Sequence, residues 1–262
     1  MKIQLLSFAS RIFYGSQAKL IESASKFGIR NWATWKYYQL ISTNFFWKNI
    51  RILRSRRGAG YWAWQPFIIK RALEKVSEGD VVVFCDSGLE FKRDISLLKG
   101  IISENDVTVF SAGNFVNSEY TKRDAFIIMG CDSDKYWNGP QVLGGFHIWK
   151  KNTNSIKVIN EYLEYCTNYQ IVSDSKDRFG STFSNYVAHR HPQSILSLLA
   201  IKHNLTVYRC PLLSASEFYS QEFKFDKSEI TDFEFEDQLL MAHRTREYRL
   251  IDRLLYKLGL WF

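Results

Sequence analysis

The sequence predicts an α/β fold in which helices cover both faces of a mostly parallel central sheet. Strand-like apolar runs alternate with segments of helical apolar spacing from the N-terminus to about residue 210. The run Val81–Cys85 is apolar throughout, which is typical of a central parallel strand covered on both faces. The 262 residues, 46% of them hydrophobic, suffice for one large domain with a substantial core.

The first half of the chain is predicted to begin with a strand at residues 2–9, followed by a helix that Ser16 caps and that runs through Lys26. Pro66 suits the first turn of a second helix, because it has no N–H group that would need a partner there. Gly79 and Asp80 then turn the chain into the strand Val81–Cys85. A helix at 94–103 and a strand at 107–110 follow, whereas residues 31–55 match neither period.

The second half is predicted to continue the alternation. Residues 120–131 are expected to form a helix and Gly144–Lys150 a strand, and the next helix opens at Thr153 or Ser155 and runs to Cys166. A polar loop at 171–188 precedes a helix that starts at Pro192. The last strand is expected at Leu205–Cys210.

The C-terminal segment differs in character, and we divide the chain into a domain at 1–240 and a segment at 241–262. Apolar residues follow helical spacing and cations occupy an adjoining face: Leu250, Ile251, Leu254, Leu255 and Leu258, with Arg246, Arg249, Arg253 and Lys257. This pattern predicts a basic amphipathic helix that either lies in a membrane interface or docks on the core.

Charge and cysteine usage limit the class of protein. The net charge of +8 favours an anionic partner, and the aromatic content of 16% suits walls that stack on bases or sugar rings. The cysteines are far apart and form no CxxC pair, which argues against a zinc site or a disulfide framework and fits a reducing cytoplasm: Cys85, Cys131, Cys166 and Cys210. We find no signal-peptide pattern and no apolar run of ~20 residues, so a cytoplasmic protein is expected.

The strongest candidate site is Asp86-Ser87-Gly88, which directly follows the apolar strand. Ligands of open α/β sheets bind where the strands end, and a carboxylate there can hold a divalent cation. Carboxylate and phosphate oxygens suit Mg²⁺ or Mn²⁺, which neutralises a leaving diphosphate. The alternative is an ordinary strand-end Asp that caps a turn.

A basic, glycine-containing turn precedes this strand by one helix. Arg57 can donate to phosphate, and Gly58 and Gly60 would let backbone N–H groups approach it. Trp62 and Trp64 are predicted to stack on a base or to line the pocket. The spacing matches neither a P-loop nor GxGxxG, and the alternative is a solvated basic turn.

Two further groups are candidates. The only DxD sequence, Asp132-Ser133-Asp134, is a rival metal site, ranked below Asp86 because a predicted helix runs into it. His189 and His191 precede a helix start that favours an anion, and either can bind a metal or a diphosphate. Gln141 is expected to present its amide to a sugar hydroxyl. A Ser/His/Asp triad is not indicated, since no GxSxG is present.

Five blocks occur in order along the chain: RGAGYWAWQPFIIKRAL, GDVVVFCDSG, YTKRDAFIIMGCDS, PQVLGGFHIWKK and HRHPQSILSLLA. Together they resemble a family of bacterial and viral glycosyltransferase-like proteins of GT-A type, associated with synthesis of surface polysaccharides such as O-antigen, capsule or lipopolysaccharide. The resemblance runs from about Arg56 to Cys210. It implies a Rossmann-like nucleotide-sugar domain in which Asp86 stands at the DxD-type strand end.

The resulting hypothesis is a metal-assisted glycosyltransferase that moves a sugar from a nucleotide sugar, UDP-linked by expectation, to a growing surface glycan or a lipid-linked glycan. The site residues fall into three roles: catalytic, Asp86, His191 and Gln193; donor-binding, Arg57, Gly58, Gly60, Trp62, Trp64, Lys70, Asp86, Ser87 and Gly88; sugar- or acceptor-binding, Lys122, Asp124, Gln141 and His189. The protein is expected in the cytoplasm, with peripheral contact to the inner face of the membrane through the C-terminal helix.

Two departures from the family pattern leave alternatives open. The Asp86–Gly88 motif has only one acid, and Pro192 precedes Gln193 where retaining transferases of this kind carry the Asp of a DQ pair. The partial likeness favours retention of anomeric configuration, whereas Pro192 supports a fold that has lost catalysis and only binds. A basic nucleic-acid-binding protein is the third possibility, and the lack of a recognised motif or basic stripe argues against it.

Overall fold

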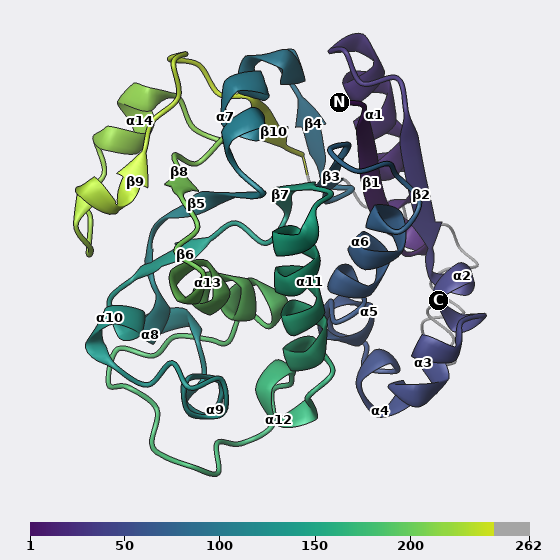
Figure 1. Cartoon of the computed structure of the whole chain (residues 1–262). Helices are drawn as coiled ribbons and strands as arrows, with labels where there is room; N and C mark the ends of the chain where they lie inside the picture. Colours follow the sequence, from purple (N-terminus) through teal and green to yellow (C-terminus); the bar gives the residue numbers. More distant parts are fainter. Residues whose placement is uncertain (244–262) are drawn as a thin grey trace.

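The computed structural model describes residues 1–243 as a mixed α/β fold (Figure 1). The strands are β1 (Ile3–Ala9), β2 (Trp32–Lys36), β3 (Val81–Cys85), β4 (Leu89–Phe91), β5 (Val107–Val116), β6 (Pro140–Val142), β7 (Phe146–Lys150), β8 (Val207–Tyr208), β9 (Ile230–Thr231) and β10 (Leu240–Ala242). The N-terminal half contains η1 (Arg11–Phe13), α1 (Tyr14–Lys26), α2 (Tyr37–Ile41), α3 (Asn44–Lys48), α4 (Ile50–Leu53), α5 (Gly58–Tyr61), α6 (Gln65–Leu73), η2 (Ile95–Leu98) and α7 (Lys99–Glu104). The C-terminal half contains α8 (Asn117–Tyr120), α9 (Arg123–Ile128), α10 (Asp134–Trp137), α11 (Thr153–Cys166), α12 (Tyr169–Val172), α13 (Pro192–Lys202), α14 (Ala215–Tyr219) and η3 (Lys227–Glu229).

The central sheet has the strand order β2-β1-β3-β7-β5-β8-β9, and β6 pairs with β5. Along this order neighbouring strands are parallel except at β7, which runs antiparallel to both β3 and β5. The short strand β6 is also antiparallel to β5. The predicted α/β fold with a mostly parallel sheet is therefore confirmed, and it is compatible with a Rossmann-like arrangement. The prediction for β3 needs one correction, because this central strand is parallel only to β1.

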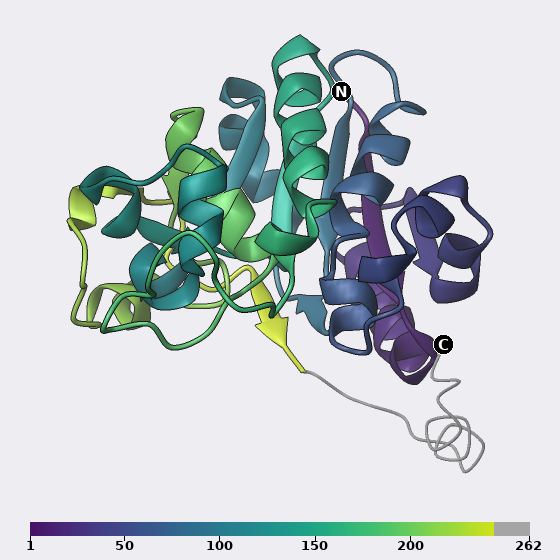
Figure 2. The same ribbon diagram turned by 90° about the horizontal axis from the view of Figure 1, so that it is seen from below.

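Alternate residues of β3 face two hydrophobic clusters, one on each side of the sheet. Val82 and Phe84 pack with residues of α6, α11 and α13, whereas Val81, Val83 and Cys85 pack with residues of α1, β4 and α7. Figure 2 shows α11 and α1 on opposite sides of the sheet. This two-sided cover explains why the VVVFC run is uniformly apolar.

Several element boundaries differ from prediction. The helix expected at 120–131 is divided into α8 and α9, because the backbone at Thr121 and Lys122 is extended and the Lys122 N–H donates to His189 Nδ1. Asn152, rather than Thr153 or Ser155, caps α11. The strand expected from Gly144 begins at Phe146, and the last predicted strand is reduced to β8.

The boundaries nearer the ends of the chain also shift. Helix α1 begins at Tyr14, so Ser16 is a buried residue within it rather than its cap. The stretch 31–55, which the sequence left unassigned, forms β2 and α2–α4. Strand β10 pairs with β4 and crosses the expected boundary after residue 240. The basic amphipathic helix predicted beyond it lies outside the described residues.

The four cysteines are free and buried, and burial raises their thiol pKa values: Cys85, Cys131, Cys166 and Cys210. Within residues 1–243, no helix is long and apolar enough to cross a membrane.

Candidate functional site

Asp86 follows the last residue of β3, beside the glycine pair that precedes β7. Its backbone N–H donates to the Gly145 carbonyl oxygen at 2.8 Å. A β-carbon on residue 145 would lie 2.9 Å from Asp86 Oδ2, a distance that real β-carbons do not show. Glycine at 145 is therefore what lets the carboxylate lie against this turn.

The other glycine of the pair makes room for Gln193. A β-carbon at Gly144 would lie 2.8 Å from Gln193 Cβ, in the first turn of α13. Gln193 Nε2 donates to Gln141 Oε1 at 3.2 Å, and Gln141 Nε2 donates in turn to Asn117 Oδ1. The Gly144–Gly145 turn thus lies against both Asp86 and Gln193. The expectation that Gln141 faces a sugar is wrong, because its buried amide is occupied by Asn117, Thr121 and Gln193.

Two buried polar residues that were not among the predicted site residues, Gln65 and Tyr162, stabilise the Gly144–Gly145 turn through hydrogen bonds. Gln65 Nε2 donates to the Gly144 carbonyl oxygen at 2.7 Å. The Tyr162 hydroxyl lies 2.6 Å from Gln65 Oε1 and 3.2 Å from the Pro192 carbonyl oxygen. Burial, Cys166 and the charge of Asp86 raise the pKa of Tyr162 well above its usual value. The available sequence signals were the Gly-Gly pair and the Gln before Pro66.

His191 lies just before α13 in a backbone conformation that is unusual for a residue with a side chain (φ 57°). Its Nδ1 lies 2.8 Å from the Val172 carbonyl oxygen, so this nitrogen carries the proton. Its Nε2 lies 3.7 Å from Asp174 Oδ1 and has no hydrogen-bond partner among residues 1–243. Burial lowers the pKa of His191 to about 4, so the ring is neutral near pH 7 and its Nε2 accepts rather than donates.

His189 is a neighbouring buried histidine. The ring centroids of His189 and His191 are 5.1 Å apart. Burial is the main cause that lowers the pKa of His189 well below its usual value, and His191 and Lys122 act in the same direction. Neither ring therefore carries positive charge near pH 7, which limits both to neutral contacts with a ligand.

The basic turn lies beside His191. An Arg57 guanidinium nitrogen is 3.1 Å from Asp174 Oδ2, and the rings of Tyr61 and Trp62 lie 5.1 and 5.6 Å from the His191 ring. The structure thus places Arg57 and Trp62 near His191, which is far from both in the sequence.

Gly58 and Gly60 in this basic turn allow close packing against neighbouring residues. A β-carbon at Gly58 would lie 2.2 Å from the Trp62 ring, and one at Gly60 2.6 Å from Leu53 Cα. The Gly60 N–H donates to the Ser55 carbonyl oxygen at 2.8 Å, so this donor already has a partner within the chain.

Trp64 differs from its predicted role. Its ring is buried and stacks on Phe8 at a centroid distance of 3.9 Å, and its Nε1 donates to the Gly58 carbonyl oxygen. Trp64 therefore belongs to the core, and only Trp62 of the two remains accessible beside the histidine.

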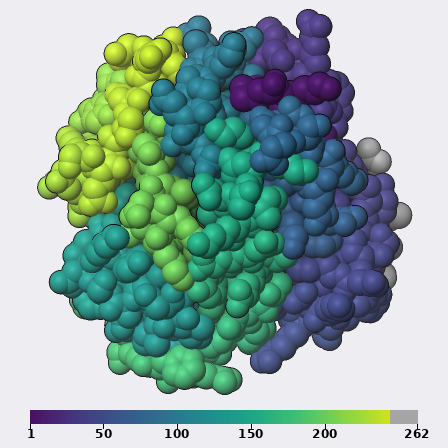
Figure 3. Space-filling view, viewed as in Figure 1, coloured from purple at the N-terminus to yellow at the C-terminus, as the bar shows by residue number. Residues whose placement is uncertain are grey.

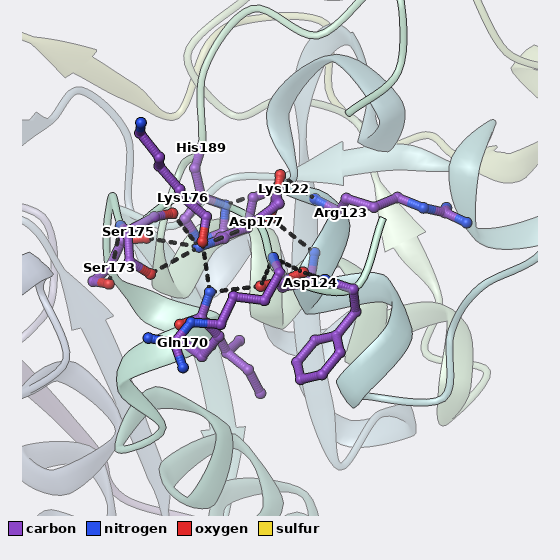
Figure 4. A network of polar contacts seen from close by, with 12 residues as sticks. Lys122, Arg123, Asp124, Gln170, Ser173, Ser175, Lys176, Asp177 and His189 are labelled. Carbon is purple, nitrogen blue, oxygen red and sulfur yellow. Dashed lines mark hydrogen bonds and ion pairs between the residues drawn. The ribbon is translucent and has the colours of Figure 1, made fainter. Parts of the chain in front are cut away.

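Lys122 and Asp124 lie in a polar network that organises the loop after α12 (Figure 4). Lys122 Nζ donates to the Ser175 carbonyl oxygen at 2.6 Å and lies 3.9 Å from Asp177 Oδ1. The fully buried Asp124 carboxylate accepts from the backbone N–H groups of Arg178 and Phe179 and from the Gln170 amide.

The expectation that Asp124 faces a sugar is therefore wrong, because its carboxylate oxygens are occupied by the loop. Burial lowers the pKa of Lys122, while Asp177 and Asp124 act in the opposite direction. A hollow of about 430 Å³ beside this network is lined in part by Lys122, Tyr186 and His189.

The rival metal site is separate from these groups. The Asp132 carboxylate pairs with both terminal nitrogens of the Arg123 guanidinium and accepts from Trp137 Nε1 at 2.9 Å. Asp134 begins α10 and lines a different hollow with Lys135 and Asn138. In the described part of the chain, no three side chains of His, Cys, Asp or Glu form a group that could hold a metal.

The remaining donor-site candidates are distributed around these groups. Ser87 is buried, and the Gly88 carbonyl oxygen accepts from the His243 N–H, which ties the strand end to the chain after β10. Lys70 lies in the last turn of α6, at the opposite end of that helix from Gln65.

Buried histidines should make the stability of the protein depend on pH. The folded-state pKa of His147 is lowered to about 3 by burial, and those of His189 and His191 are also lowered. Below about pH 6.5 the unfolded chain binds protons at these residues, whereas the folded chain does not. The contribution of the neutral histidines to the free energy of unfolding is therefore at its maximum above that pH. It should fall by up to about 1.4 kcal/mol per pH unit per histidine as the pH decreases towards 4.

Urea denaturation at a series of pH values between 7.5 and 4.5 would measure this slope. The variant His147→Gln removes one of the three groups and should show a shallower slope than the unchanged chain, whatever its absolute stability. An identical slope would show that His147 takes up its proton in both states.

A comparison of the chain with models of known protein families found no matching family, and a comparison with curated protein sequences found no match.

Proposed function

We propose that this protein is a glycosyltransferase that uses a nucleoside-diphosphate sugar, with UDP as the expected nucleotide. The observation that carries the proposal is the convergence of Asp86 and Gln193 on the Gly144–Gly145 turn at the end of a central strand. Strand ends and helix N-termini are where open α/β sheets bind phosphorylated ligands, and both meet at this turn.

The single carboxylate at this turn is compatible with a divalent cation that is held partly by the substrate. A single carboxylate, Asp86, stands at the strand end, and Mg²⁺ or Mn²⁺ is commonly held by one or two carboxylates together with substrate phosphate oxygens and water. When bound, such an ion would supply Lewis-acid stabilisation of the charge that develops on the leaving diphosphate.

Side chains of the protein would orient the substrates. The half-buried Gln193 amide, whose nitrogen donates to buried Gln141, offers its remaining N–H and its oxygen to sugar hydroxyls. Trp62 offers a face on which a base can stack. Because His191 is neutral near pH 7, we assign it a hydrogen-bonding role through Nε2 and not charge neutralisation of the diphosphate. Arg57 is the permanent cation nearest this ring among these candidates.

We further propose that the acceptor is a growing surface glycan and that transfer occurs in the cytoplasm. Lysine and arginine outnumber aspartate and glutamate by 35 to 27, which suits an anionic donor and an anionic lipid surface. The partial likeness around Gln193 favours retention of the anomeric configuration, which the anomeric signals of the product would decide.

The proposal is tested by measuring nucleotide release from UDP-, GDP- and CMP-sugars in the presence of Mn²⁺, Mg²⁺ or a chelator. We expect release from one nucleoside-diphosphate sugar that the chelator suppresses. Binding of that donor without turnover, even with candidate glycan acceptors, would instead identify a protein that has kept the fold and lost catalysis. If no donor bound, the transferase proposal would fail.

A further inference from the structure

The positive charge of this protein is concentrated in one part of the sequence. From residue 23 to residue 73 the chain contains no aspartate or glutamate and has these basic residues: Lys26, Arg30, Lys36, Lys48, Arg51, Arg54, Arg56, Arg57, Lys70 and Arg71. These ten charges exceed the net charge of +8 for the whole chain, so the rest of the protein carries a slight excess of acidic residues. The segment is therefore a strongly cationic part of the chain.

Helices α2, α3 and α4 within this segment form one corner of the protein, beyond the edge strand β2 (Figure 1). Their inward residues are buried in the core: Tyr37, Leu40, Phe46, Ile52 and Leu53. Besides Ser42 and Asn44, their exposed residues are apolar or cationic, and we call the following set the α2–α4 surface: Tyr38, Trp47, Lys48, Ile50, Arg51 and Arg54. The segment occupies the lower right of the space-filling view (Figure 3).

The apolar members of this surface are unusually accessible. Tyr38 is 63% exposed, Trp47 60% and Ile50 38%, although Tyr38 and Trp47 are each adjacent in sequence to a residue that packs in the core. Trp47 touches Phe46 edge-on, and the rest of its ring faces outward. Exposed aromatic and aliphatic side chains among lysines and arginines are the composition of a membrane-interface surface.

We propose that the α2–α4 surface docks the protein onto an anionic lipid membrane. Trp47, Tyr38 and Ile50 would enter the interface, and Lys48 and Arg54 would contact lipid phosphates. Charge complementarity favours this partner, because the segment has no acidic residue to oppose an anionic surface and exposed cations stand beside exposed Trp47 and Ile50. A nucleic acid is less well matched, since aliphatic Ile50 offers it neither stacking nor hydrogen bonds.

The position of this surface is consistent with the candidate site but does not depend on it. Helix α4 contacts the turn α5, whose preceding residue Arg57 pairs with Asp174 beside His191. Docking through α2–α4 would therefore bring the His191 side of the molecule close to the lipid surface. Membrane binding is measured without any donor sugar, so its failure and a failure of the transferase proposal are distinguishable.

The test is flotation of the full-length protein with vesicles of phosphatidylcholine alone and of equal parts phosphatidylcholine and phosphatidylglycerol. We expect binding to the anionic vesicles only, weakened by added salt. The double variant Lys48→Glu, Ile50→Ser should lower the partition coefficient by roughly tenfold or more. The Trp47→Phe variant should lose most of the fluorescence quenching by brominated lipid.

A matched double variant on another part of the surface provides the control. Leu97→Ser with Lys99→Glu also removes one exposed aliphatic side chain and reverses one exposed lysine, but at η2 and α7. It should bind vesicles like the unchanged protein. Equal binding by both double variants, no binding to anionic vesicles, or displacement of the vesicles by an oligonucleotide at low concentration would each overturn the proposal.

Discussion

Replacing Asp86 with asparagine should lower metal-dependent nucleotide release by at least about a hundredfold while leaving the protein folded. Asparagine has nearly the same shape, and the backbone N–H bond from residue 86 to Gly145 does not involve the side chain. What is lost is the negative charge at the end of β3. Steady-state release of nucleotide and a thermal unfolding curve measure the two parts of this prediction.

The matched control for this experiment is Asp132→Asn, which removes a carboxylate from the rival DxD sequence. Because Asp132 is already paired with Arg123, this variant should retain most of the activity. A second variant, Gly145→Ala, places a methyl group against the Asp86 carboxylate and should also reduce release. Full activity of Asp86→Asn would overturn the assignment of Asp86, and loss of activity only in Asp132→Asn would move the metal site to the DxD sequence.

Replacing Asp124 with alanine should destabilise the protein by about 3 kcal/mol or more. The change leaves the backbone N–H groups of Arg178 and Phe179, and the Gln170 amide, without their buried acceptor. It also leaves buried Lys122 with one fewer carboxylate nearby. Urea unfolding measures the loss, and limited proteolysis should show the first new cleavage within residues 173–182.

The variant Asp174→Ala provides the comparison, since Asp174 lies in the same loop but is partly exposed and paired with exposed Arg57. Surface pairs of this kind contribute about 0–1 kcal/mol, so its unfolding curve should move little. If Asp124→Ala were as stable as Asp174→Ala, the loop would be held by contacts other than the Asp124 carboxylate.

The sequence was sufficient to predict those elements whose cause is local. The apolar run of β3, the helix begun at Pro66 and the helix begun at Pro192 depend on burial or on a residue near the first turn, and all are present. The direction of β7 was not predicted, because apolar pattern does not distinguish a parallel from an antiparallel neighbour. The break between α8 and α9 depends on a distant side chain, His189, which a local pattern does not contain.

In the candidate site, too, local features were predicted from the sequence, whereas contacts between distant residues were not. Asp86 was proposed from its place after a buried strand, and Arg57, Trp62, His191 and Gln193 from their chemistry. The structure added the Gly144–Gly145 turn between Asp86 and Gln193, the buried Gln65 and Tyr162 that hold it, and Asp174 between Arg57 and His191. The roles expected for Trp64 and Asp124 were wrong because a tryptophan or an aspartate in a polar or basic stretch gives no sign of complete burial.

The reversed direction of β7 has a consequence for the order in which the chain can assemble. Because β7 runs against β3, the residues that meet Asp86 are those before β7, about sixty positions later in synthesis, and Gln193 follows almost fifty positions after them. Closing such long loops is slow and entropically costly, so it tends to follow local folding. A nascent chain that ends before residue 140 would hold β1, β2 and β3 but neither Gly145 nor Gln193, and competence to bind a ligand would be acquired only near the end of translation.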